Sequence, residues 1–422
     1  MKRNITTTLM LVVLSALLLG LPGLIVPVTA ELIGSYLTWE PLWTVEGSQE
    51  QQGSRFSSAV ALAGDLNDDG HPDAVVGADK WLVGGTKHAA AFVYLGSAGG
   101  LETTYSLLLT PTNSDDILST AVDGAGDVNG DGVDDLIVGA PGHKEDGFGG
   151  KAGAAFIYYG SNTLLDGTWD WWKHGDSADA KFGASVAGTG DVNNDGYDDV
   201  LIGSPLYSPI DPLTLKPIPE LEQCGRAYLF FGGQYGLEST PLIFEGTQLS
   251  AQVGYQVAGL GDVNNDGIAD FAVSTPYYDR DVQYDDRGRV WVFYGTDDLT
   301  QLIIPDWQAS GMEWRDYFGR SIAAAGDVNG DNIGDVLVGA SGFDGPSVDN
   351  VGAAYLYYGS DTGLAASPAW MATSNDGYSA FGWALAGLGD VNGDMYDDVA
   401  VGAYLYEGDQ SLEGQVFLYR GS

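Results

Sequence analysis

The sequence is nearly devoid of cysteine. Its 422 residues include one cysteine, Cys224, so no disulfide bond can form within the chain. Something other than covalent cross-links must therefore stiffen the fold. A catalytic role for this thiol is poorly supported, because the sequence shows no evident base beside it.

Positive charge is scarce as well. The chain carries 17 lysines and arginines against 58 aspartates and glutamates, which gives a formal net charge of −41 at pH 7. A surface of this sign repels phosphate groups, which argues against nucleic acid or an anionic membrane as a partner. The balance fits cation binding, a saline habitat, or both.

Long apolar runs are absent after residue 30, so we expect no membrane span in the mature chain. Before that point, two cations precede a long apolar run that ends near Ala30. This pattern predicts a secretory signal peptide over residues 1–30. The alternative is an uncleaved N-terminal anchor, because glycine and proline interrupt a rather long run. We expect the protein to be secreted, extracellular or held at the cell surface.

Helical periodicity is nearly missing beyond the same point. Short runs such as AAAFVYLGS, GAAFIYYGS and GRVWVFYG alternate in the way that is typical of half-buried strands. The sequence therefore predicts an all-β protein.

One acidic pattern occurs six times. It is written GDLNDDGHPD from Gly64, GDVNGDGVDD from Gly126, GDVNNDGYDD from Gly190, GDVNNDGIAD from Gly261, GDVNGDNIGD from Gly326 and GDVNGDMYDD from Gly389. The first aspartates of successive copies lie 62, 64, 71, 65 and 63 residues apart. A small-residue strand precedes each copy, and an apolar, an aromatic and a weaker strand follow it. Four strands per repeat of this length predict a six-bladed β-propeller with four-stranded antiparallel blades.

The two ends of the chain predict how the ring closes. The last copy stops after its third strand, GQVFLYRGS, and lacks a fourth. The segment PLWTVEG, from Pro41 to Gly47, is similar to the fourth strand PLIFEG, from Pro241 to Gly246. We therefore expect this N-terminal strand to pair with the last blade, so that residues 31–422 form one propeller domain.

These motifs resemble FG-GAP repeats, the calcium-binding propeller repeats of integrin α subunits. Phe-Gly occurs at Phe182, Phe318 and Phe381, and Gly-Ala-Pro is complete at Gly139. The resemblance covers the whole chain after residue 30, although integrin propellers have seven blades and this chain has six copies. It implies a non-catalytic adhesion or protein-interaction module with calcium in the acidic loops.

The acidic pattern places oxygen side chains at loop positions 1, 3, 5 and 9, counted from the first aspartate. Position 7 can offer its backbone carbonyl, as at the start of an EF-hand loop. Oxygen donors in an irregular cage favour Ca²⁺ over Mg²⁺ and disfavour zinc. The alternative is a solvated turn of Asp, Asn and Gly. We predict up to six Ca²⁺ ions, held by Asp65, Asn67, Asp69, His71 and Asp73; Asp127, Asn129, Asp131, Val133 and Asp135; Asp191, Asn193, Asp195, Tyr197 and Asp199; Asp262, Asn264, Asp266, Ile268 and Asp270; Asp327, Asn329, Asp331, Ile333 and Asp335; and Asp390, Asn392, Asp394, Tyr396 and Asp398.

Position 6 of the loop distinguishes the copies. It is glycine in the first four copies, Asn332 in the fifth and Met395 in the sixth. A left-handed turn at this position suits glycine and is tolerated by asparagine, but it costs methionine about 1–2 kcal/mol. The sixth site should therefore be the weakest.

The other connections vary in length and open on the opposite face of a propeller. The longest begins at Ser204 and runs to Cys224. We expect this face to bind an extracellular protein or a glycan, although any one of its aromatic rings could instead cap a blade. A lectin, or an accessory domain of an extracellular hydrolase, is the alternative; no nucleophile elbow, HExxH or P-loop is present. The aromatic residues on these connections are Trp81, Tyr207, Tyr277, Tyr278, Phe343, Tyr404 and Tyr406.

Overall fold

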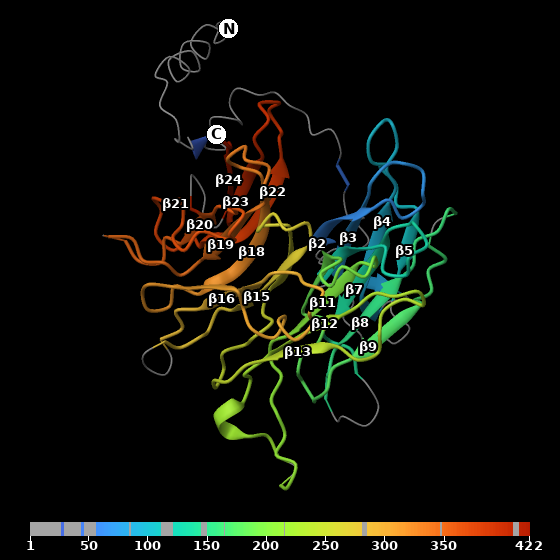
Figure 1. The fold of residues 1–422 in the computed structure, drawn as a ribbon, viewed down its shortest axis with the longest axis horizontal. Helices are drawn as coiled ribbons and strands as arrows, with labels where there is room; N and C mark the ends of the chain where they lie inside the picture. The colour runs from blue at the N-terminus through green and yellow to red at the C-terminus, as the bar shows by residue number, and fades with distance from the viewer. Residues whose placement is uncertain are drawn as a thin grey trace, which may run out of the picture.

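The structure, a computed structural model, describes residues 27–28, 44–45, 56–83, 86–110, 121–144, 150–163, 165–214, 216–280, 285–346, 348–407 and 413–422. These residues form six four-stranded sheets, arranged in chain order around a common axis (Figure 1). The predicted all-β six-bladed propeller is therefore confirmed. Within this described part, no helix combines the length and the apolar character needed to cross a bilayer.

Each of the first five blades is an antiparallel meander of four strands that follow one another in the sequence. The first two blades contain β2 (Phe56–Gly64), β3 (Asp73–Val83), β4 (Thr86–Tyr94) and β5 (Leu107–Leu109), then β6 (Ala121–Gly126), β7 (Asp135–Ala140), β8 (Ala154–Tyr158) and β9 (Trp171–His174). The third and fourth contain β10 (Ser185–Gly190), β11 (Asp199–Ser204), β12 (Arg226–Phe230) and β13 (Leu242–Glu245), then β14 (Val257–Gly261), β15 (Asp270–Thr275), β16 (Arg289–Phe293) and β17 (Trp307–Ser310). The fifth contains β18 (Phe318–Gly326), β19 (Asp335–Ala340), β20 (Ala353–Tyr357) and β21 (Trp370–Thr373), and the sixth contains β22 (Phe381–Gly389), β23 (Asp398–Ala403) and β24 (Gln415–Tyr419).

The second strand of a blade is apolar along most of its length because neighbouring blades cover both of its faces. All six residues of β7 and all six of β11 are buried. The hydrophobic clusters join adjacent blades: one links Val75 of β3 to Val138 of β7, and another links Leu201 of β11 to Val273 of β15. Burial of apolar surface between blades therefore stabilises the ring.

The last blade is completed by an N-terminal strand, as predicted, but the strand is a different one. β1 (Pro27–Val28) pairs antiparallel with β24, with Val28 opposite Leu418. Of the predicted strand at 41–47, the structure describes only Thr44 and Val45, which form no strand, and Val45 packs against the first blade. An edge strand pairs through its backbone, so side-chain similarity alone did not identify the segment. β1 falls within residues 1–30, whose assignment as a signal peptide stays a prediction.

The first and sixth blades differ from the others at their inner strands. The inner strands pack side by side in the order β2, β6, β10, β14, β18 and β22. Val60 of β2 is 61% exposed, whereas Val186, at the same repeat position in β10, is 6% exposed. Leu62 of β2 and Leu388 of β22 are also exposed. The described residues therefore leave apolar side chains uncovered where the first and last blades face one another.

Candidate metal loops and partner-binding face

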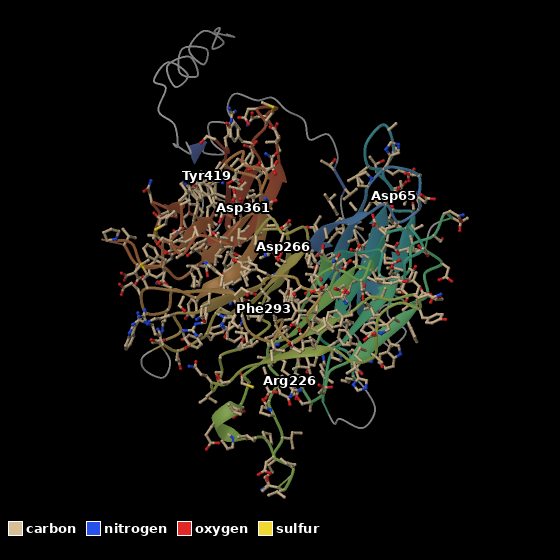
Figure 2. All side chains as sticks on the ribbon, viewed as in Figure 1. Asp65, Arg226, Asp266, Phe293, Asp361 and Tyr419 are labelled. Carbon is tan, nitrogen blue, oxygen red and sulfur yellow. The ribbon has the colours of Figure 1, made fainter. Side chains whose placement is uncertain are left out.

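The six acidic loops lie at the same end of their blades. Each loop joins the first strand to the second, so that position 1 directly follows one strand and position 9 begins the next. In the third blade, Asp191 follows β10 and Asp199 begins β11. Asp65 and Asp266, labelled in Figure 2, belong to the loops of the first and fourth blades. The structure therefore brings the predicted residues of each copy together in one loop per blade.

Backbone N–H groups fix the side chains of the third loop. Asp191 accepts from the N–H of Asp195 at 3.0 Å and from that of Gly196 at 2.8 Å. Asn193 accepts from Asp195 at 3.1 Å, and Asp195 accepts from Tyr197 at 3.1 Å. Each accepting oxygen has a second lone pair, so these bonds orient the oxygens without exhausting them.

The aspartate at position 9 is buried in every copy and is held by two backbone N–H groups. In the third copy, Asp199 Oδ2 accepts from Val192 at 3.0 Å, and Oδ1 accepts from Gly232, after the third strand, at 2.8 Å. The corresponding pair of bonds recurs in the other five copies. Position 9 therefore ties three segments of a blade together at the loop.

Burial raises the pKa of these carboxyl groups. The pKa is about 8 for Asp135 and Asp199 and about 7 for Asp270 and Asp335, because burial removes water from the charged form. The carboxylates at positions 5 and 1 of the same loop raise it further, although the backbone N–H bonds act in the opposite direction. Charged aspartates in this arrangement therefore need either a proton or a cation.

The donor set fits a calcium ion in its chemistry. Each loop has three carboxylates, an asparagine carbonyl and a backbone carbonyl, all of them oxygen donors of the kind that Ca²⁺ prefers. As they stand, the described His, Cys, Asp and Glu side chains form no group of three or more placed to hold a metal ion. The fit therefore rests on the donor types, on the oriented oxygens and on the buried carboxylate at position 9.

The backbone at position 6 has the predicted left-handed conformation. Its φ is 94° at Gly196, 66° at Asn332 and 73° at Met395. The sixth loop departs from the others in a second way, since the Asn392 amide donates to Asp398 at 3.1 Å instead of the side chain accepting from position 5. The Asn392 side-chain oxygen, a predicted calcium ligand, is therefore not oriented as its counterparts are in the other loops.

Position 8 has a role that the sequence analysis missed. Asp198, which precedes the predicted ligand Asp199, accepts a hydrogen bond from the N–H of Asp127 in the preceding blade at 2.8 Å. Asp134 and Asp397 form the same bond, each with the blade before it. The signal in the sequence was an aspartate at position 8 of one copy and a glycine before position 1 of the preceding copy. The glycine is needed because a Cβ on Gly126 would overlap the Asp198 carboxylate.

Comparison with known proteins agrees with this architecture. A family model described as FG-GAP repeat matches residues 120–158, 182–213, 253–293, 318–357 and 381–419. The chain carries FG-GAP repeats. The match covers the second to sixth blades, and the first blade follows the same strand order without being matched.

Curated relatives of this FG-GAP propeller are integrin α subunits. Integrin alpha-5 of Xenopus laevis is 31% identical over 230 residues, which is 52% of this chain and 19% of the relative. Integrin alpha-8 of Gallus gallus is 30% identical over 237 residues, or 55% and 21% of the two chains. Integrin alpha-IIb of Mus musculus is 36% identical over 171 residues, or 40% and 16%. The matched part therefore spans about a fifth of each relative's length.

On the face of the FG-GAP propeller opposite the acidic loops, most of the predicted aromatic residues are built into the blades. Trp81, Phe343 and Tyr406 pack against hydrophobic clusters. Tyr207 is buried, whereas Tyr404 is 47% exposed. Only a few of these rings are therefore exposed enough to contact a partner.

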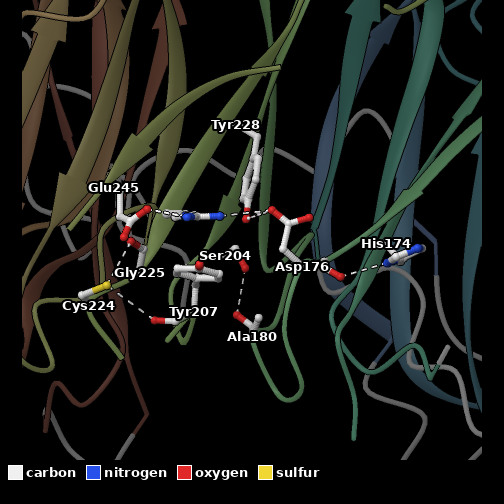
Figure 3. A network of polar contacts seen from close by, with 11 residues as sticks. His174, Asp176, Ala180, Ser204, Tyr207, Cys224, Gly225, Tyr228 and Glu245 are labelled. Atoms are coloured by element: carbon white, nitrogen blue, oxygen red, sulfur yellow. Dashed lines mark hydrogen bonds and ion pairs between the residues drawn. The ribbon is translucent and has the colours of Figure 1, made fainter. Parts of the chain in front are cut away.

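The longest connection of this face is anchored by Arg226, whose partners Tyr207, Asp176 and Glu245 are labelled in Figure 3. Its guanidinium carbon lies 3.7 Å from the centre of the Tyr207 ring, and its Nη1 lies 3.2 Å from Asp176. Arg226 also pairs with Glu245 through Nε, at 2.8 Å, and Nη2. Cys224 is buried beside this network, and burial raises the pKa of its thiol to about 11. The network is therefore a structural anchor.

Proposed function

We propose that the chain is a calcium-stabilised, non-catalytic adhesion or protein-interaction module that acts outside the cell or at its surface. Six copies of an oxygen-rich loop support the calcium assignment, and similarity to integrin α subunits supports the adhesion class. The buried Cys224 thiol, whose pKa is raised, gives no support to cysteine catalysis.

The face opposite the acidic loops binds the partner. The observation that carries this assignment is a cavity of about 370 Å³ formed by the fourth, fifth and sixth blades. Its lining includes Tyr277, Tyr317, Trp383 and Tyr404, and residues of this type dominate the binding energy of protein interfaces. Calcium holds the opposite ends of the blades, so that this surface is rigid before the partner arrives.

Two tyrosines on opposite faces test the location of the site. Peptides selected by the immobilised chain from a displayed random 12-residue library, in calcium buffer, serve as the probe. Replacement of the exposed Tyr404 by alanine should weaken their binding about tenfold or more. Tyr235 is 92% exposed and follows β12 on the acidic-loop side, so Tyr235→Ala is the matched control and should leave binding unchanged. If Tyr235→Ala weakens binding and Tyr404→Ala does not, the partner site lies on the acidic-loop face, and the assignment is wrong.

A further inference from the structure

One arginine, Arg320, lines the aromatic cavity. Arg320 is the third residue of β18, and its guanidinium carbon lies 4.0 Å from the centre of the Trp383 ring and 4.6 Å from that of Tyr255. Its Nη1 donates to the Tyr277 hydroxyl at 3.0 Å. These rings come from the fourth and sixth blades, so Arg320 of the fifth blade joins three blades at one point.

The cavity presents a positive charge in a strongly acidic protein. Its lining contains no acidic residue among those that the structure describes. The ion pairs between described residues involve Arg226 and Arg287, and Arg320 takes part in none of them. In a chain of net charge −41, this cation therefore forms no ion pair with a carboxylate among the residues that the structure describes.

The guanidinium also has donors to spare. Arginine carries five N–H groups, and the hydrogen bond within the described residues uses one of them, to Tyr277. The Trp383 and Tyr255 rings lie 4.0 and 4.6 Å from its carbon and restrict the orientation of its plane. A planar, preoriented guanidinium of this kind matches a carboxylate through two parallel hydrogen bonds.

The arrangement of the rings favours a protein over a sugar as the source of that carboxylate. Tyr277 meets Tyr255 and Tyr317 edge to face, at interplanar angles of 72° and 64°. The Trp383 and Tyr255 rings each have one face occupied by the guanidinium. The exposed rings of the lining are Tyr378, Tyr404 and Trp383. Arg, Tyr and Trp around a small cavity are the residues that anchor protein partners.

We propose that this cavity binds the carboxylate of an aspartate or glutamate side chain on a partner protein, with Arg320 as its counter-ion. The inference rests on the proposed function, because it specifies what the partner-binding face recognises. Since the whole chain repels acidic ligands at long range, recognition depends on this local contact and is best measured near physiological salt, where distant charges are screened.

The experiment uses the peptides selected by the full chain in calcium buffer. They should share an aspartate or glutamate, and peptides with that residue changed to asparagine or glutamine should bind about thirtyfold more weakly or worse. Arg320→Met should cause a loss of the same size, and Arg320→Lys a smaller one. Arg289→Met is the matched control, because it removes another arginine that stacks on a tyrosine, Tyr278, at 3.7 Å. It should leave binding unchanged, and thermal melting confirms that each variant is folded.

The outcomes separate this inference from the function on which it rests. Peptides that are weakened by Tyr404→Ala but not by Arg320→Met or by the amide replacement overturn the carboxylate site and leave the face assigned. If the peptides bind equally well to the Tyr404→Ala and Arg320→Met variants, the assignment of the partner site to this face is wrong as well. Arg320-dependent binding of an oligogalacturonate, with no acidic peptide selected, overturns the choice of a protein partner.

Discussion

At the scale of single residues, the glycine before an acidic loop makes room for the neighbouring blade where that blade has an aspartate at position 8. Gly126 and Gly261 both have φ of 69°, but a Cβ on Gly126 would overlap Asp198, whereas a Cβ on Gly261 would meet nothing within 4 Å. Alanine at either position adopts the left-handed backbone at a cost of about 1–2 kcal/mol. The difference between the two positions therefore isolates the contact between blades.

We predict that Gly126→Ala lowers the free energy of unfolding by about 3 kcal/mol, because it also displaces the Asp198 carboxylate from the Asp127 N–H. Gly261→Ala should cost about 1–2 kcal/mol only. Urea denaturation of the two variants measures both values. Equal losses would show that the carboxylate at position 8 contributes nothing to stability.

A second residue-scale feature is an isolated acid on an inner strand. Asp123 of β6 occupies a position that is alanine in the other five copies. Burial raises the pKa of its carboxyl group to about 7, although N–H groups of Gly188 and Gly124 donate to it. Because this pKa is higher in the folded chain than in the unfolded chain, the group destabilises the fold as pH rises from about 4 to about 7.

Asp123→Asn should remove this pH dependence. Relative to the wild type, the variant should gain about 3–4 kcal/mol of unfolding free energy between pH 4 and pH 7, with little further change above that range. Denaturation at a series of pH values in saturating calcium measures the difference. A constant difference across the whole range would contradict the raised pKa.

At the scale of the strands, the ends of the ring are the weakest part of the architecture. Val60 and Val186 occupy the same repeat position but differ tenfold in exposure, at 61% and 6%. Val186→Ala should therefore cost about 2 kcal/mol, and Val60→Ala less than about 0.5 kcal/mol. Thermal denaturation of both variants compares them. A similar loss for Val60→Ala would show that the first and last blades pack together in solution.

The strands and loops differ in how far the sequence predicted them. Copies of one motif at near-constant spacing predicted six blades and every loop, because the apolar second strand and the left-handed turn are local properties. The closing strand and the Asp198 contact depend on which segments meet in space, and the motif carries no information about that pairing. Arg320 was missed because its neighbours come from three blades that are distant in sequence.

At the scale of the whole molecule, we propose that calcium stabilises the fold in place of disulfide bonds. Extracellular calcium modules bind with dissociation constants of about 10⁻⁴–10⁻³ M, and a tenfold excess of calcium contributes roughly 1.4 kcal/mol per site. Several such sites together are comparable with the whole stability of an ordinary domain. The sixth loop should contribute least, because Met395 is strained and Asn392 is turned toward Asp398.

Scanning calorimetry of the full chain at increasing free calcium tests this claim most directly. We predict that the melting temperature rises steadily with calcium concentration and falls on chelation. Asp195→Ala should lower the melting temperature in calcium more than Asp394→Ala, since the sixth loop binds more weakly from the start. A melting temperature that does not depend on calcium, in the wild type and in both variants, would contradict the account.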